Sequence, residues 1–353
     1  MRPFTGREGS SGVISVFIFI SGATLLVYSA ERLIGSLVGI SRGLRMSVFL
    51  LAIIFTGIEF DDIVLGIALK LEDEQEVALG LVIGTAVSFS GIVLALGAIL
   101  TPTRFTIPRD YIAVFAVAPL VLLVFAIRKE VTTAEAVVLI LLFTAWIAYV
   151  AVRESRRETA TFRNLEIIEE LEEEDESLDD PARREAVSTM SIFRQRFSGW
   201  LNLGLAVVAL GGIIIGAATV SEGSDQILNR WGIEGTVFGA TVVTLVLSIE
   251  DLFLKARPIR RGVPEIGIGN VIGSLIFSVT GKLGIVVLAG GEVAIGSSVL
   301  RWHLPALLVL TFVAAAFMWT GRLKRWHGFV LLSLYIGYWV VSYVVYGSAP
   351  IDD

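Results

Sequence analysis

Cysteine is absent from the 353-residue sequence, histidine occurs only twice, and charged residues make up only 18% of the chain. Without cysteine there are no disulfides, thiolate metal sites or cysteine nucleophiles, and two histidines are too few for a histidine metal cluster. Long polar stretches are also scarce, and the single one found spans residues 153–198. Hydrophobic residues instead make up 55% of the chain, and the mean hydropathy is +0.79. This composition, far from that of soluble domains, predicts a polytopic membrane protein.

Apolar runs of about 20 residues, enough to cross roughly 30 Å of hydrocarbon, fill most of the chain. The expected helices span residues 12–39, 46–69, 75–100, 110–127, 133–152, 199–222, 234–254, 263–290, 304–320 and 326–346. The first stretch is too long for a signal-peptide core. The pattern predicts an all-α membrane protein with three parts: an N-terminal five-helix half (1–152), an acidic loop (153–198) and a C-terminal five-helix half (199–353).

One segment occurs twice, 189 residues apart, as Glu76–Thr85 and again as Glu265–Ser274. The same offset superposes the acidic pair Asp61-Asp62 on Glu250-Asp251, and both pairs lie inside apolar stretches. With five helices in each half, the two copies must cross the membrane in opposite directions. The sequence therefore predicts ten transmembrane helices in two inverted repeats, an arrangement that places a substrate site between the halves at the membrane midplane.

The distribution of Lys and Arg predicts the orientation in the membrane. With the N-terminus outside, the short inner loops hold eleven basic residues and the outer segments seven, and the 153–198 loop adds eight Arg on the inner side. We therefore expect a multi-pass protein of the cell (inner) membrane. Both termini should lie outside, and the acidic loop should be cytoplasmic.

Polar residues follow helical spacing inside the apolar segments that carry the repeat. They lie on the second helix (Glu59, Asp62), the third (Thr85), the seventh (Thr244, Ser248, Asp251) and the eighth (Ser274, Ser278, Lys282). Ionisable residues within a membrane are costly and usually mark an ion pathway. Carboxylates with hydroxyls form a hard oxygen site that suits Ca²⁺, and Na⁺ or H⁺ would occupy the same groups in exchange. Lys282 is a candidate tethered cation for Asp62 or Asp251, or else a side chain that reaches toward the membrane interface.

These residues resemble the calcium/cation antiporter superfamily, which includes the sodium/calcium exchangers. That family repeats Gly-Thr-Ser-Leu-Pro-Glu on helices 2 and 7 and Gly-Asn-x-Ile-Gly-Ser-Asn on helices 3 and 8. Here the second motif is nearly intact at Gly269–Ser274, whereas its N-terminal copy at Gly80–Thr85 lacks the Asn. Gly39-Ile40 and Gly232-Ile233 look like the family's turn before helices 2 and 7. The resemblance covers nearly all of the chain outside 153–198.

The resemblance maps the family's ion-binding Glu onto Asp62 and Asp251, and the Pro before it onto Asp61 and Glu250. Without that Pro, we expect no built-in helix break to free carbonyls for an ion. The resemblance implies one set of metal ligands and one of second-tier or proton-accepting groups. The metal ligands are Asp62, Asp251, Glu59, Ser248, Ser274 and Ser278; the second tier is Asp61, Glu250, Asn270, Thr85, Thr244 and Lys282.

The expected function is that of a secondary antiporter, not an enzyme, which exchanges a divalent cation, foremost Ca²⁺, for Na⁺ or H⁺ by alternating access. Three alternatives stay open: the same fold transporting Mg²⁺ or Na⁺ alone, an intramembrane enzyme with an aspartate pair, and an ion-binding homologue that does not transport. The expected partners are the lipid bilayer and small inorganic cations. No cofactor and no nucleic acid are expected, and the sequence does not indicate an oligomeric state.

Overall fold

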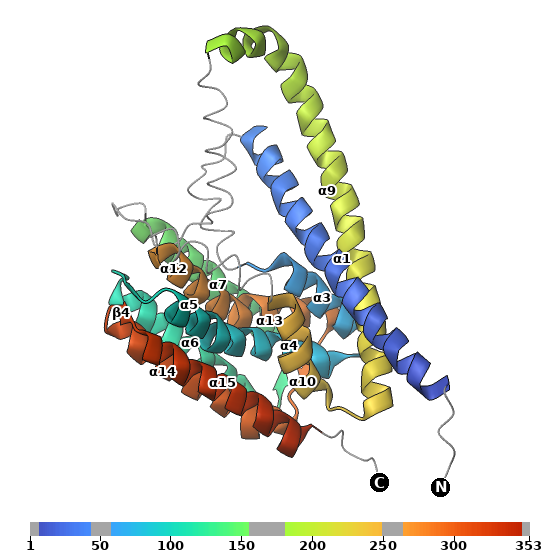
Figure 1. The fold of residues 1–353 in the computed structure, drawn as a ribbon, viewed down its shortest axis with the longest axis vertical. Helices are drawn as coiled ribbons and strands as arrows, with labels where there is room; N and C mark the ends of the chain where they lie inside the picture. Colours follow the sequence, from blue (N-terminus) through green and yellow to red (C-terminus); the bar gives the residue numbers. More distant parts are fainter. Residues whose placement is uncertain (1–6, 44–57, 155–180, 249–263, 348–353) are drawn as a thin grey trace.

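The structure, a computed structural model, describes residues 7–43, 58–154, 181–248 and 264–347 (Figure 1). Among these residues, eight helices are long and apolar enough to cross a membrane. Two shorter helical segments, α3 (Phe60–Leu71) and Gly235–Ser248, lie where the second and seventh helices were expected. The described part of the chain is therefore mostly helical, with eight candidate membrane spans, as expected of a multi-pass membrane protein.

The two helices that carry the repeated segment form the centre of the molecule. The first runs through α4 (Gln75–Ser88), η1 (Phe89–Val93) and α5 (Leu94–Leu100), and the second through α12 (Pro264–Phe277), η3 (Ser278–Lys282) and α13 (Leu283–Gly290). Their apolar spans are 94% and 89% buried, whereas no other span exceeds 44%. A helix that is apolar on every face is expected in the interior, because no polar face holds it at a surface.

Both central helices change to π-helix at equivalent positions. Phe89–Val93 and Ser278–Lys282 are separated by the same 189 residues as the repeated segments. A π-helical turn replaces the i→i+4 hydrogen bond by an i→i+5 bond, which rotates the faces beyond it, and such turns are frequent at functional sites. Val93 ends the first π-helix and Lys282 the second, so the two residues are counterparts.

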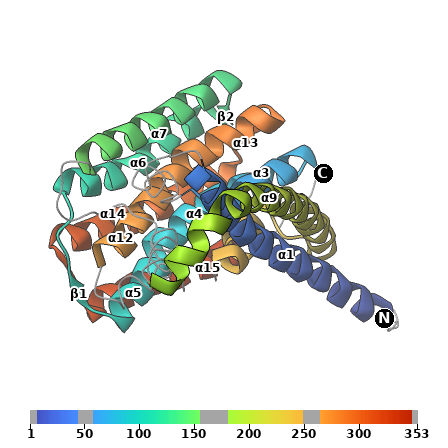
Figure 2. The same ribbon diagram turned by 90° about the horizontal axis from the view of Figure 1, so that it is seen from above.

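Four outer helices flank this centre, and two short antiparallel ladders join the halves (Figures 1 and 2). Strand β1 (Thr103–Arg104) pairs with β4 (Arg322–Leu323), and β2 (Glu130–Val131) pairs with β3 (Val293–Ala294). Each ladder thus takes one strand from each half. The outer helices are α6 (Arg109–Arg128), α7 (Thr133–Glu154), α14 (Leu304–Trp319), which follows η4 (Val299–His303), and α15 (Arg325–Tyr346).

Helices α1 (Arg7–Gly43) and α9 (Pro181–Trp231) lie side by side along their length and cross the other helices obliquely (Figures 1 and 2). Small residues allow this close contact: a Cβ on Gly216 would lie 2.7 Å from the backbone nitrogen of Leu26. Packing of small residues is the usual way that membrane helices approach one another. The pair contacts the rest of the bundle mainly through α3.

Two predictions about the helix boundaries were wrong, and a third was confirmed. The helix expected over 199–222 is α9, which begins at Pro181 inside the expected 153–198 loop and ends at Trp231. Residues 181–198 combine a Pro suited to a first helical turn with Ala, Arg, Glu and Met, which favour helix, although the stretch contains too many charged residues to resemble a membrane span. Gly39 lies within α1 rather than in a turn. Gly232 does form the expected turn, with a left-handed φ of 59°.

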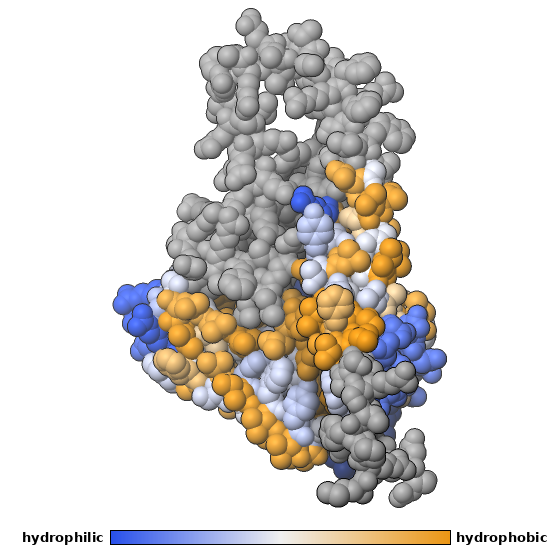
Figure 3. All heavy atoms as spheres, turned by 45° about the vertical axis from the view of Figure 1, so that its right-hand side comes forward, coloured by the Kyte–Doolittle hydropathy of each residue, from blue (hydrophilic) through white to orange (hydrophobic). Residues whose placement is uncertain are grey.

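Hydrophobic side chains cover much of the outer surface between more hydrophilic ends (Figure 3). The exposed apolar residues of the outer helices include Val124, Leu141, Val208, Phe312 and Val344. In a soluble protein such a continuous apolar surface marks an interface, whereas a surface that faces lipid requires it. The surface therefore agrees with the apolar spans in indicating a multi-pass membrane protein.

Candidate cation site

Helix α3 begins at the predicted acidic residues Glu59 and Asp62 of the second helix. Ile58 and Glu59 are not helical, and Glu59, the N-cap residue, has the extended backbone angles φ −100° and ψ 98°. The first turn carries Asp61 and Asp62, which the positive end of the helix dipole favours. The expectation that the missing Pro leaves this helix unbroken was therefore wrong, because the chain is non-helical just before Phe60 without it.

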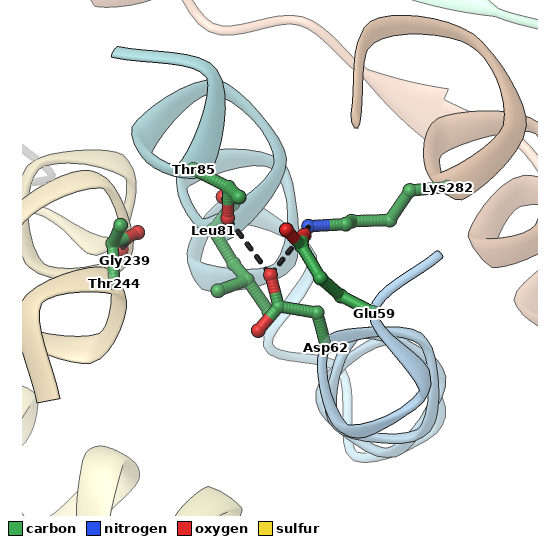
Figure 4. Close-up of polar contacts among 7 residues, drawn as sticks. All are labelled: Glu59, Asp62, Leu81, Thr85, Gly239, Thr244 and Lys282. Atoms are coloured by element: carbon green, nitrogen blue, oxygen red, sulfur yellow. Dashed lines mark hydrogen bonds and ion pairs between the residues drawn. The ribbon is translucent and has the colours of Figure 1, made fainter. Parts of the chain in front are cut away.

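A buried ion-pair cluster, which we call the Lys282 cluster, consists of Glu59, Asp62, Thr85 and Lys282 (Figure 4). The Lys282 Nζ lies 2.8 Å from Glu59 Oε2 and also donates to Asp62 Oδ2. The exposed fractions of the Lys282, Glu59 and Asp62 side chains are 0%, 8% and 6%. An unpaired charge at such depth would cost several kcal/mol, on the order expected for a desolvated ion, so the three charges stabilise one another. The predicted pairing of Lys282 with Asp62 is present.

Thr85 ties the cluster to the central helix α4. Its Oγ1 lies 2.9 Å from Asp62 Oδ2 and 2.8 Å from the carbonyl oxygen of Leu81, so one hydroxyl proton serves two acceptors. Hydrogen bonding to the preceding turn is common for a Thr within a helix. The second contact, to a carboxylate from another helix, makes Thr85 part of the cluster.

Thr244 of the seventh helix lies on the other side of α4 from Lys282 (Figure 4). This segment consists of α10 (Gly235–Phe238), η2 (Gly239–Val243) and residues 244–248. Thr244 Oγ1 donates to the carbonyl oxygen of Gly239 at 2.8 Å, and it packs so closely on Gly84 that a Cβ there would lie 2.3 Å away. The structure therefore does not bring Thr244 into the Lys282 cluster. Ser248 is buried near the end of this segment.

The predicted residues of the eighth helix are on the second central helix. Ser274 and Ser278 are fully buried, and the Ser278 Oγ has no hydrogen-bond partner among the described residues. The same holds for Asn270 Oδ1. A buried oxygen without a donor is costly unless a ligand or water satisfies it, so these two atoms are available to a cation. Both are hard oxygen donors.

Other predicted residues do not join the cluster or lie outside the described residues. Asp61 is partly exposed in the first turn of α3, about 100° from Asp62 around the helix. Glu250 and Asp251 lie outside the described residues. Within the described ranges, no group of three or more His, Asp or Glu side chains is placed to hold a metal ion. Among the described residues, the site thus has the two carboxylates Glu59 and Asp62, and both are paired with Lys282.

Ser88 is a further buried polar residue that the prediction did not include among the ligands. It lies three residues after Thr85 on α4, and therefore close to the same face. The alignment of the two halves pairs Ser278 with Phe89, and Ser88 lies one position earlier. The i, i+3 spacing from Thr85 was the signal that indicated it.

The family model described as sodium/calcium exchanger protein matches residues 14–152 and 201–344, which together form most of the chain. The chain belongs to the sodium/calcium exchanger family. The resemblance inferred from the two motifs is therefore confirmed. Because the family consists of exchangers, the protein is a membrane transporter of the ion-antiport class.

Similar proteins extend over different parts of the chain. The sodium/calcium exchanger MaX1 of Methanosarcina acetivorans is 31% identical over 140 residues, which cover 39% of this chain and 40% of that protein. The uncharacterized membrane protein MJ0091 of Methanocaldococcus jannaschii is 24% identical over 336 residues, covering 92% of this chain and 96% of that protein. The alignment with MaX1 thus spans less than half of that exchanger, whereas the one with MJ0091 is nearly complete.

The fold is also similar to a solved exchanger. The structure of the sodium-calcium exchanger NCX_Mj soaked with 2.5 mM Na⁺ and 0.1 mM Ca²⁺ matches with a TM-score of 0.56 and 20% sequence identity. The match covers 94% of this chain and 99% of that chain. At this identity the likeness concerns the fold alone.

Proposed function

We propose that the protein is a secondary antiporter that exchanges a divalent cation, foremost Ca²⁺, for Na⁺ or H⁺. The observation that carries this proposal is the pair of buried carboxylates, Glu59 and Asp62, at the start of a helix inside an exchanger fold. Hard oxygen ligands of this kind favour Ca²⁺ over soft metals. Buried ionisable groups in a membrane protein mark a pathway for ions.

The proposed architecture is ten transmembrane helices in two inverted repeats. The two ladders support it, because the repeat offset carries β1 to residues 292–293, which overlap β3. One ladder joins β1 to β4 and the other joins β3 to β2, so exchanging the halves exchanges the ladders. An approximate two-fold axis between the halves would produce this pattern.

The proposed central ligands are Asp62 and Asp251, assisted by Glu59, Ser248, Ser274 and Ser278. The unsatisfied buried Oγ of Ser278 supports its inclusion. Asp61, Glu250, Asn270, Thr85 and Thr244 form the proposed second tier, in which Thr85 holds Asp62 in place and Thr244 is the weakest member because α4 lies between it and Lys282.

Alternating access would come from sliding of the α1–α9 pair against the remaining helices. The pair is held to the bundle mainly through α3, the helix that carries Glu59 and Asp62, so its movement would open and close the path to them. Both chain ends would lie outside the cell membrane, and the connection between α7 and α9 would be cytoplasmic.

The test is ⁴⁵Ca²⁺ uptake into proteoliposomes under an outward Na⁺ gradient and, separately, under a pH gradient. We expect uptake under one gradient, and its loss in the Asp62→Asn and Asp251→Asn variants. The residue swaps preserve side-chain size, so gel filtration of both variants should still show folded protein. Wild-type rates in Asp62→Asn would contradict the assignment of the ligand.

A second candidate is transport of Na⁺ alone on the same scaffold. The observation that favours it is the charge of the Lys282 cluster: two carboxylates and one ammonium leave a single negative charge, which suits a monovalent ion. ²²Na⁺ uptake in the same vesicles, with Ca²⁺ as a competitor, separates the two candidates. Na⁺ uptake that excess Ca²⁺ does not inhibit would favour the second.

A further inference from the structure

Lys282 lies deep inside the bundle and not at a membrane interface. It is within the span Gly267–Gly290, away from both of its ends, and its side chain is fully buried. A lysine that reaches toward an interface keeps its ammonium in contact with water. Lys282 instead points across to α3, and its Nζ lies 5.9 Å from the centre of the Phe277 ring. The interfacial alternative that the sequence left open therefore does not apply.

The ammonium of Lys282 compensates part of the charge of the two carboxylates, Glu59 and Asp62, that a transported cation would bind. One Nζ contacts both Glu59 and Asp62, and Asp62 also accepts from Thr85. A metal ion that bound to the same oxygens would meet the repulsion of this charge and would have to displace it. The cation site and the lysine site thus share their ligands.

This arrangement belongs to only one half of the molecule. The repeat counterpart of Lys282 is Val93, at the end of the first π-helix, and Val93 is buried among hydrophobic side chains. The lysine is thus an addition to the duplicated scaffold at one position. Its long side chain reaches the start of α3 from the second central helix (Figure 4).

Obligatory exchange has a simple physical origin. A carrier whose empty site holds uncompensated carboxylates does not readily switch between its inward-open and outward-open states. During the switch these charges would enter a low-dielectric environment without a cation. Only a loaded carrier then returns, and each movement of one ion requires another in the opposite direction. A site that supplies its own cation is free of this requirement.

We propose that the Lys282 ammonium is the built-in counter-cation of the empty site, so that the carrier returns without a bound ion. The inference rests on the proposed cation transport through Glu59 and Asp62. It goes further in stating that this protein moves its cation in one direction without a counter-transported ion, in addition to exchanging it. In each cycle the transported ion displaces the ammonium, and after release the ammonium pairs with Glu59 and Asp62 again.

The test is efflux of ⁴⁵Ca²⁺ from proteoliposomes with N-methylglucamine thiocyanate at equal concentration and equal pH on both sides of the membrane, and with a chelator outside. The permeant anion carries the compensating charge, and a trapped pH dye shows whether protons enter in exchange. For the wild-type protein we expect efflux within about threefold of the rate into Na⁺ medium, and no change in lumenal pH, because the ammonium lowers the charge penalty that the empty site meets on return.

Three variants sharpen the test. Lys282→Met should lose efflux into the Na⁺-free medium by about tenfold or more and regain it when Na⁺ is added outside, because its empty site is uncompensated. Lys282→Arg keeps the charge and should keep the unassisted efflux. Lys70→Met is the matched control, because Lys70 lies at the far end of α3 and binds Gln75 and the Glu292 carbonyl.

A second readout does not depend on transport. Without cations, Lys282→Met should melt at a lower temperature than the wild type, and Ca²⁺ should raise its Tm more than that of the wild type. Equal responses to Ca²⁺ would contradict a shared site.

Wild-type efflux that falls tenfold or more when exchangeable cations are removed outside would overturn the inference and leave the proposed exchange intact. So would unassisted efflux in Lys282→Met at the wild-type rate. If Lys282→Met fails to fold, the comparison of wild-type efflux with and without exchangeable cations outside still tests the inference. Absence of wild-type efflux in every medium would instead overturn the proposed function.

Discussion

The helix running through α4 and α5 and the one running through α12 and α13 occupy equivalent central positions, and each changes to π-helix at the same place in its repeat. They differ in what ends that turn: a valine at position 93 and a lysine at position 282. The backbone was therefore kept through the duplication while the charge was not. A duplicated scaffold supplies two buried positions of the same shape, and a single substitution gives one of them a separate role.

The largest expected effect on stability comes from removing the positive charge of Lys282, on the central helix of the C-terminal half. Lys282→Met leaves Glu59 and Asp62 uncompensated, which should lower the free energy of unfolding by about 3–5 kcal/mol. Adding Glu59→Gln to this variant should restore part of the loss, because one buried charge fewer remains. Thermal melting in detergent without divalent cations measures both effects. A Lys282→Met protein as stable as the wild type would show that the ion pairs contribute nothing.

The next prediction compares two buried hydroxyl groups on the central helices. The hydroxyl of Thr85 is hydrogen-bonded to Asp62, whereas that of Ser278 has no partner among the described residues. Thr85→Val removes the hydrogen bond to Asp62 and should cost about 1.5–3 kcal/mol, as for bonds to charged groups. Ser278→Ala removes a hydroxyl without a partner and should change stability by less than about 0.5 kcal/mol. Its effect should appear in ⁴⁵Ca²⁺ affinity instead. The comparison fails if Ser278→Ala destabilises the cation-free protein more than Thr85→Val.

A smaller effect tests the close crossing between the halves. Gly84→Ala would place a Cβ 2.5 Å from Ala240 Cα, backbone that cannot move aside, and should cost about 1–3 kcal/mol by overpacking. Gly211→Ala on α9 has nothing within 4 Å, so the higher helix propensity of Ala should raise stability by about 0.5–1 kcal/mol. Melting temperatures of both variants, measured side by side, check the opposite signs.

The smallest effect is a pH dependence that arises at Glu74, which has no acidic counterpart in the C-terminal half. Glu74 caps α4, whereas the equivalent position is Val263. Burial, together with the hydrogen bond to Asp225, raises the pKa of Glu74 from 4.5 to about 7. A raised pKa means that protonated Glu74 favours the folded state, so this stability is complete below pH 4.5 and is lost as the pH rises through about 7.

Glu74→Gln should therefore flatten the fall in Tm between pH 4.5 and about 7, since glutamine does not titrate. Thermal melting of the variant and the wild type at several pH values measures the difference. An unchanged slope in the variant would assign the pH dependence to another group.

Much of this protein follows from its sequence alone. Apolar runs of membrane length fixed the helical class, and a repeat offset visible in the residues placed Asp62, Thr85, Ser274 and Ser278 on buried helices. These features are local or periodic, since helix formation and burial in lipid depend on composition over about 20 consecutive residues.

The tertiary structure decided which polar residues meet. The spacing of polar residues predicts Thr244 on the same helix face as Ser248 and Asp251, but Thr244 packs against Gly84, so α4 lies between it and Lys282. No proline directly precedes the start of α3 at Phe60, so the sequence did not indicate that a helix begins there. The π-helical turns rotate the faces beyond them, so regular i, i+4 counting no longer gives the direction of Lys282. A long, flexible lysine pairs with whichever carboxylates lie within its reach, and only the packing of α3 against α13 places Glu59 and Asp62 there.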